Sequence, residues 1–398
     1  MKRYTVFYFL VAGALLSGCT FNRQSSDGLP VIDVRKNYPE KEIVLTDIAD
    51  VTYIHLNTQD ENFLYKGGIQ YETDNTYLVV DFASNSILFF SKEGNPLTRF
   101  NRYGQGPEEY IQLDYTNVIF DEATDDVYVP QFGRSNIQVY SSKGEYKRRL
   151  TLPDGLILRG ESRIVSFDDQ SLLVFNSSKQ LDKFMKIRAG DYFASSSQLN
   201  DSTFFLISKM DGKIIEYVEM PSPSTVIVNQ KNGVFTTYTI YRITKCADGY
   251  LLYHPENDTV YHYKNDKTLT PILHKIPLIS ESPNLVMNGC LDAGMYQFIC
   301  VSKISDMGNP IAYYMRDKKN GEMFRQKIVL PDYRGKEFFI YTYSHSVRYI
   351  ENEYQFDLSL YELKQAFKEN KLSGKLKELV ATLNEDTDND IFMLVKFK

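Results

Sequence analysis

Alternating apolar and polar residues predict short β-strands that recur in a fixed order. In Tyr77–Phe100, two apolar runs joined by a polar turn are followed by a glycine turn and a third run. The same order returns about fifty residues later, in Val127–Leu150. A unit of three or four strands with this period, roughly 40–50 residues, is typical of a β-propeller blade.

A turn of the same kind marks each further repeat along the chain. These turns lie at Gly94, Gly144, Gly212, Asn265–Asp266 and Gly321. The interval between the second and third turns is longer than the first by about one hairpin, which predicts an insertion at Lys179–Asp201. A count of seven blades would fit a strict period, but insertions explain the long intervals better.

The two ends of the chain predict how the ring closes. Ile391–Phe397 matches the second apolar run of the earlier repeats and ends where the glycine turn is due, so a sixth blade lacks its last strand. Glu42–Leu56 is strand-like and can supply that strand. Sharing a blade between the termini removes an exposed sheet edge. We therefore expect an all-β, six-bladed β-propeller over residues 42–398.

One segment has helical instead of strand periodicity. Leucines and other apolar residues recur at helical spacing over residues 359–383. Ser373-Gly374 predicts a break into two short helices. We expect a small helical insertion in the last blade that caps a blade edge; a helix that docks a partner is the alternative.

The N-terminus predicts export and lipid attachment. Two basic residues precede the apolar run Tyr4–Leu16, which ends in Leu16-Ser17-Gly18-Cys19. This tetrapeptide resembles the bacterial lipobox, so we expect a signal peptide over 1–18, acylation of Cys19 and a flexible tether over 19–41. Thr20 favours the outer membrane of the cell envelope, on either face. The alternative is an ordinary secretory signal with a chance cysteine.

Several of these segments together resemble a known family. The lipobox, the run Tyr53–Leu56, the loop Gly104–Tyr110, the late helix and the closing run Val395–Lys398 look like the six-bladed β-propeller lipoproteins related to NHL-repeat proteins. The resemblance covers almost the whole mature chain and implies the fold. It implies no catalytic residues, because the family shares no catalytic motif.

Arginines on predicted inner strands are candidate ligand-binding residues. Arg163, Arg242 and Arg348 each lie on the strand that should line the central channel. Three guanidinium groups at one channel mouth would favour a carboxylate or phosphate ligand. The alternative is local pairing of each arginine with an acid. His345, close to Arg348 in the chain, is a further candidate.

The loop Arg102–Tyr110 occurs in one repeat only. Its two glycines could direct backbone amides toward an anion, with Arg102, Gln105 and Glu108 as the side chains able to touch a ligand. A phosphate loop would need a lysine and a long following helix, which are missing. The alternative is a rigid crossover between two blades.

Metal, thiol and charge patterns predict no resident cofactor. Asp386–Asp390 alternates acids like a calcium loop but lacks the required glycine, which favours a polar turn. The five histidines show no metal-ligand spacing. Cys246, Cys290 and Cys300 are expected as buried free thiols, although the last two could face each other on neighbouring strands. A net charge of −6 without a long basic cluster argues against nucleic-acid binding.

These patterns favour an envelope-anchored binding or scaffold propeller, more a binding protein than an enzyme. Its ligand would be a peptide, a glycan or a partner protein at the channel mouth, and its contact with the membrane would run through the lipid. The alternative is a metal-dependent lyase or hydrolase in the central channel. Its metal ligands would have to come from scattered inner-strand residues, namely Glu72, Asn117, Asp292 and His345.

Overall fold

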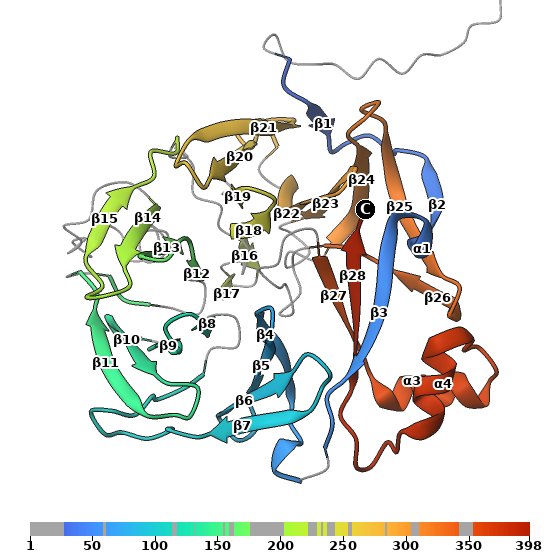
Figure 1. The fold of residues 1–398 in the computed structure, drawn as a ribbon. Helices are drawn as coiled ribbons and strands as arrows, with labels where there is room; N and C mark the ends of the chain where they lie inside the picture. Colours follow the sequence, from blue (N-terminus) through green and yellow to red (C-terminus); the bar gives the residue numbers. More distant parts are fainter. Residues whose placement is uncertain are drawn as a thin grey trace, which may run out of the picture.

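The strands of the protein form sheets that stand around a central axis (Figure 1). The structure is a computed structural model, and it describes residues 28–58, 61–113, 118–131, 133–153, 156–158, 163–175, 203–221, 229–231, 234–236, 243–253, 257–282, 285–303, 310–341 and 353–398. This all-β ring is a β-propeller arrangement, as the strand repeat predicted.

The first three blades are antiparallel sheets of four strands each, in chain order. The first is β4 (Gly67–Glu72), β5 (Thr76–Asp81), β6 (Ser86–Ser91) and β7 (Pro96–Phe100). The second is β8 (Ile119–Asp121), β9 (Asp126–Pro130), β10 (Asn136–Tyr140) and β11 (Tyr146–Thr151). The third is β12 (Arg163–Ser166), β13 (Ser171–Phe175), β14 (Phe204–Ser208) and β15 (Ile214–Tyr217). The expected insertion Lys179–Asp201 lies outside the described residues.

The next two blades are larger, because each gains a strand from the N-terminal segment. The fourth contains β18 (Ile243–Cys246), β19 (Gly249–Leu252), β20 (Thr259–Lys264) and β21 (Leu269–Ile276). The fifth contains β22 (Leu285–Ala293), β23 (Tyr296–Lys303), β24 (Pro310–Asp317) and β25 (Met323–Leu330), and β26 (Tyr333–Phe338) pairs with β25. A separate hairpin pairs β16 (Asn229–Lys231) with β17 (Val234–Thr236).

The blade count differs from the sequence prediction. The described residues form five blades of at least four strands, and not six. The sheet predicted as the sixth blade has three strands, β27 (Glu353–Leu358), β28 (Ile391–Phe397) and β3 (Ala49–His55). We call it the closing sheet. The inner strand predicted around Arg348 lies outside the described residues.

The N-terminal segment is bound to three sheets in succession. β1 (Val31–Asp33) pairs in parallel with β21, and β2 (Glu40–Val44) pairs in parallel with β25. After α1 (Leu45–Ile48), β3 pairs antiparallel with β28 over its whole length, so the predicted pairing of the termini is confirmed. Figure 1 shows these blue strands beside the gold, orange and red strands of the second half of the chain.

Two predicted boundaries at the N-terminus were wrong. Glu42–Leu56 is not one strand, since its first residues belong to β2 on the neighbouring blade. The predicted tether 19–41 contains β1, where Ile32 is fully buried, so the folded part begins before residue 42. Sequence alternation reveals a strand but not the sheet edge on which it pairs.

The glycine turns of the first three blades each dock on the sheet before their own. Gly144 has φ +80°, and a Cβ there would lie 2.5 Å from the Cβ of Phe100, at the end of β7. A Cβ on Gly94 would lie 2.3 Å from the carbonyl oxygen of His55, at the end of β3. Since Gly94 docks on β3 as Gly144 docks on β7, β3 is the outermost strand of the closing sheet.

The helical insertion forms the two predicted helices, α3 (Leu360–Lys368) and α4 (Gly374–Thr382). Tyr333 of β26 forms a β-bridge with Leu372, between the helices. The insertion therefore caps the extended hairpin of the fifth blade, beside which Figure 1 shows it. Among the described helices, none combines the length and hydrophobicity needed to span a membrane. A short 3₁₀ helix, η1 (Glu61–Phe63), precedes the first blade.

The three described cysteines are buried free thiols, as predicted. Gly289, and not Cys290, is the register partner of Cys300 across β22 and β23. Burial raises the pKa of the Cys246 and Cys300 thiols to about 12. Thiols this weakly acidic are poor nucleophiles at neutral pH.

We predict that Gly144→Ala destabilises the protein more than Gly133→Ala. Both glycines have positive φ, but a Cβ at Gly133 meets nothing within 4 Å. Both variants should lose roughly 1–2 kcal/mol to the left-handed backbone. Gly144→Ala should lose roughly 1–3 kcal/mol more through overpacking against Phe100. Urea denaturation measures both, and equal losses would show that the turn is not docked.

We predict that removal of Ile391–Lys398 abolishes cooperative folding. This deletion takes away β28, the middle strand of the closing sheet, and leaves both β27 and β3 without their partner. Soluble yield and thermal unfolding are the measurements. The control is Lys396→Ala, an exposed position on the same strand. A truncated protein that melts within a few degrees of the parent would contradict the ring closure.

Candidate functional site

A hollow of about 620 Å³ opens where the closing sheet meets the first blade. One wall is the segment Leu64–Gly67 with Asp81 and Ala83, and the other is the acidic turn that precedes β28. We call it the seam pocket. Because β3 and β28 come from opposite ends of the chain, the pocket exists only in the closed ring.

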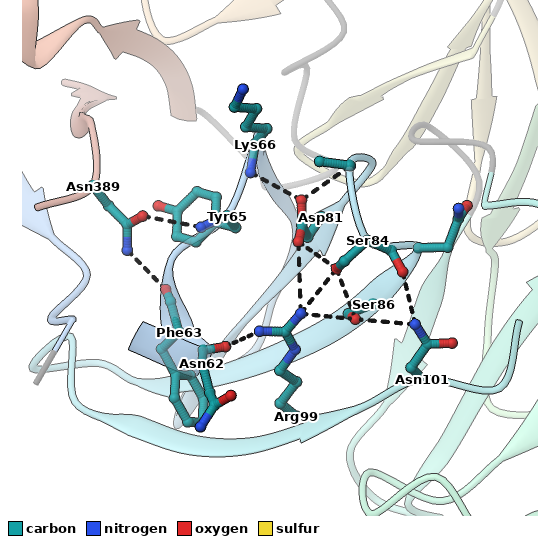
Figure 2. Close-up of polar contacts among 12 residues, drawn as sticks. Asn62, Phe63, Tyr65, Lys66, Asp81, Ser84, Ser86, Arg99, Asn101 and Asn389 are labelled. Carbon is teal, nitrogen blue, oxygen red and sulfur yellow. Dashed lines mark hydrogen bonds and ion pairs between the residues drawn. The ribbon is translucent and has the colours of Figure 1, made fainter. Parts of the chain in front are cut away.

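Asp81 organises the wall on the first blade (Figure 2). Its Oδ1 accepts hydrogen bonds from the Lys66 amide at 3.0 Å and the Ala83 amide at 3.1 Å, and its Oδ2 accepts one from the Ser84 hydroxyl. Arg99 Nη2 lies 3.8 Å from Oδ2 and donates to Ser84 Oγ at 2.9 Å. Asp81 is 3 % exposed, so this carboxylate holds the turn rather than facing solvent.

Asn389 joins the two walls. Its Oδ1 accepts a hydrogen bond from the Tyr65 amide at 3.2 Å, and its Nδ2 donates to the carbonyls of Leu56 at 3.1 Å and Phe63 at 3.0 Å. Figure 2 shows the bonds to Tyr65 and Phe63. A single buried amide thus satisfies three backbone groups of the segment that links β3 to the first blade.

The acidic turn is a structural turn, as the missing glycine predicted. Asp388 Oδ2 accepts from the Asn384 amide at 2.7 Å, and its Oδ1 lies 3.1 Å from Thr58 Oγ1. Asp390 Oδ1 accepts from the Leu360 amide at 2.7 Å and so caps the first turn of α3. In the part of the chain that the structure describes, no three His, Cys, Asp or Glu residues are grouped to hold a metal.

A second hollow, of about 310 Å³, lies on the other side of the closing sheet, against α3. We call it the aromatic groove. Its lining combines aromatic residues with charged and hydroxyl groups: Tyr333, Lys336, Glu337, Phe338, Phe339, Tyr341, Phe356, Asp357, Leu358, Ser359, Glu362 and Leu363. Three of the rings, Phe339, Tyr341 and Phe356, are partly exposed.

Both hollows lie at one end of the closing sheet. Asp357 lines the aromatic groove, and its Oδ2 would lie 3.7 Å from a Cβ on Gly68 of the first blade. Tyr65 lines the seam pocket, and its ring stacks on Phe392 at 6.4 Å. Burial, and next the charges of Asp357 and Asp390, raise the pKa of the Tyr65 hydroxyl.

The loop Arg102–Tyr110 is a rigid crossover. Tyr110 is fully buried, and its hydroxyl donates to the Asn85 carbonyl at 2.7 Å. The Gly106 amide donates to Glu109 Oε2 at 2.7 Å, and a Cβ on Gly104 would collide with the same carboxylate. The loop's own acid therefore occupies the amide that was predicted to face an anion.

The predicted ligand residues of this loop remain at the surface. Arg102, Gln105 and Glu108 are exposed. Arg102 Nε donates to the Gly144 carbonyl at 2.7 Å, which ties the first blade to the second. Ligand contact by these three side chains stays a prediction.

The predicted cluster of channel arginines stays a prediction. Arg163 begins β12 and is 2 % exposed. Arg242, Arg348 and His345 lie outside the described residues, as does Cys19.

Two of the four residues considered as ligands of a channel metal form ion pairs with lysines of their own blades. Glu72 forms an ion pair with Lys92, and Asp292 forms one with Lys318 at 2.5 Å. Asn117 and His345, the other two, lie outside the described residues.

The sequence matches a known protein family. Residues 29–275, more than half of its length, match the family described as "Domain of unknown function (DUF4934)". The chain belongs to the DUF4934 family. The matched part runs from the N-terminal segment to the end of the fourth blade, so it includes β1.

A solved structure shares the fold of this DUF4934 protein. A candidate exported protein of Bacteroides fragilis NCTC 9343 is 18 % identical, with a TM-score of 0.61, over 90 % of this chain and 98 % of that one. A member of the DUF4221 family from Bacteroides vulgatus is 10 % identical, with a TM-score of 0.46, over 88 % and 97 %. Virginiamycin B lyase from Staphylococcus aureus is 16 % identical, with a TM-score of 0.36, over 71 % and 75 %. No curated protein matches.

Sequence reasoning missed both hollows of the DUF4934 protein. The aromatic groove is lined by residues 333–363, where β26 and the segment after it meet β27 and α3, and no local pattern shows how these segments pack against one another. The available signal was the aromatic run Phe338-Phe339-Ile340-Tyr341 next to the predicted helical insertion. The tyrosine-rich composition suits stacking of a sugar or peptide but gives no location for it.

We predict that His55 makes the closing sheet sensitive to acid. Its Nε2 lies 3.5 Å from Asp388 Oδ1, and burial lowers the pKa of His55 below its ordinary value of 6.5 despite that neighbour. The folded state therefore favours the neutral ring. This contribution to stability is fully present above about pH 6.5 and is lost as the pH falls below it.

The test is urea denaturation at pH 7.5 and pH 5.5. His55→Gln should lose less stability on acidification than the parent protein does. His262→Gln is the matched control, since His262 pairs with Asp248 at 2.8 Å within the fourth blade. Equal acid sensitivity of the parent and His55→Gln would contradict the prediction.

Proposed function

We propose that this DUF4934 protein is a lipid-anchored binding propeller of the cell envelope, held to the outer membrane by acylated Cys19. The N-terminal sequence, with its basic start, apolar run and lipobox, supports export and anchoring. The solved structure that shares its fold is a candidate exported protein, which supports export. The ligand is a peptide, a glycan or a partner protein.

The observation that carries the binding role is the pair of hollows at one end of the closing sheet. Their walls combine aromatic rings with carboxylates, and hydrogen bonds to backbone groups hold several of those carboxylates in place. Rigid concave sites of this composition bind small molecules or single side chains without much loss of conformational entropy.

A metal-dependent enzyme is the competing function. The binding proposal predicts that the purified mature protein, which lacks the signal peptide, contains less than one divalent metal ion per chain by elemental analysis. Its thermal stability should also be unchanged by EDTA. One tightly bound metal per chain, with stability lost on chelation, would overturn the binding proposal in favour of the enzyme.

We predict that Cys19→Ser releases the protein from membranes without unfolding it. Cys19 is the residue of the lipobox that carries the acyl chains, and two or three chains anchor far more firmly than one. Cell fractionation and detergent partitioning measure the effect. Ser17→Ala, a change inside the lipobox that keeps the cysteine, is the control. Retention of the Cys19→Ser protein on membranes would disprove the lipid anchor.

A further inference from the structure

The aromatic groove has the chemistry of a site for one sugar ring. Its volume of about 310 Å³ is at the lower end of small-molecule sites, which measure roughly 300–1,000 Å³. Its floor is aromatic, and its rim carries Lys336, Glu337, Asp357 and Glu362. We propose that this groove binds a neutral hexose unit of a glycan. This inference rests on the proposed binding function and assigns a ligand class to it.

The rings of the floor are held in fixed positions. Phe339 stacks on Tyr313 with ring centres 4.6 Å apart, and Tyr341 lies 5.1 Å from the same ring. Between them, the Ile340 amide donates to buried Gln326 Oε1 at 3.0 Å, and Gln326 Nε2 donates back to the Ile340 carbonyl at 3.0 Å. Phe339 and Tyr341 therefore lie on the same side of a clamped backbone.

The opposite wall is equally fixed. Phe356 of β27 packs edge-on against Phe338 at 5.1 Å and against Tyr354 at 4.7 Å. The Tyr354 hydroxyl donates to the Tyr341 carbonyl at 2.9 Å, which joins the closing sheet to the segment that follows β26. Partly exposed rings that are already ordered offer flat apolar faces, on which the C–H face of a pyranose can stack at little entropic cost.

The rim favours a ligand rich in hydroxyl donors and without negative charge. Its three carboxylates outnumber its one lysine, so an anionic ligand would be repelled. Ionised carboxylates only accept hydrogen bonds, and sugar hydroxyls are donors that match them. Lys336 and Glu362 form an exposed ion pair at 3.2 Å across the gap from β26 to α3, which provides a donor beside an acceptor.

The absence of tryptophan from the chain permits a direct test. Phe339→Trp places a single indole in the groove, and Tyr361→Trp places one on α3 at a position that is 64 % exposed and not part of the groove lining. Both full-length proteins without the signal peptide are titrated with cellotetraose, maltotetraose and mannotetraose. We expect a saturable change of the Phe339→Trp emission by at least one of them, with a midpoint on the order of 1 mM, and none for Tyr361→Trp.

A second variant tests the rim. Glu362→Gln should weaken binding of the same tetrasaccharide by about tenfold or more, because it removes a charge-assisted hydrogen bond. Glu369→Gln, at the far end of α3 and outside the groove lining, should leave the affinity unchanged. The wild-type protein is followed in parallel by saturation-transfer NMR, which needs no reporter.

The outcomes separate the two proposals. If no tetrasaccharide changes the emission and wild-type protein gives no saturation transfer at 10 mM sugar (a concentration about tenfold above the expected midpoint), the hexose site is overturned. The binding function then still stands or falls by the metal and EDTA measurements. If both tryptophan reporters respond alike, or if Glu369→Gln weakens binding as much as Glu362→Gln, binding lies elsewhere and the groove assignment is equally overturned.

Discussion

The pairing of β3 with β28 is the interaction on which the rest of the structure depends. It joins residues near the two ends of the chain over seven register pairs and converts an open row of sheets into a ring. A propeller that failed to close would expose two long sheet edges. The strands that precede β3 in the chain, β1 and β2, pair with the fourth and fifth blades, so these two contacts fix where β3 lies. Closure therefore depends on three sheets at once.

The same closure creates one of the two hollows on which a function is proposed. The seam pocket lies between the first blade and the closing sheet, so it does not exist in a linear array of blades. The aromatic groove lies between the closing sheet and the hairpin of the fifth blade, and residues 333–363 alone line it. Asp390 caps α3, which lines the aromatic groove, and Asn389 donates a hydrogen bond to the segment before β4, which lines the seam pocket. The turn before β28 therefore contacts a wall of each hollow. Stability of the ring and geometry of the two hollows are thus coupled.

The repeated turns show how the ring is kept in register. Gly94, Gly144 and Gly212 each place a backbone turn against the end of the preceding outer strand, at distances that no side chain would permit. Hydrogen bonds and ion pairs between side chains and the next blade add to the docking of the glycine turns. Lys209 pairs with Asp121 at 2.7 Å across the second and third blades, and Arg102 binds the Gly144 carbonyl across the first and second. Neighbouring blades are therefore joined by backbone fit and by polar bonds.

The sequence alone determined the β-propeller class, the strands of the first two repeats, the paired ends and the broken helix, because strand alternation, turn glycines and helical spacing are local signals. It misassigned β1 and the start of β2, and it predicted six blades where the described residues form five. Those features depend on which sheet edge a strand meets, which no local pattern encodes. The aromatic groove likewise required the tertiary structure, since Phe339, Phe356 and Glu362 lie on three segments whose packing against one another no local pattern encodes.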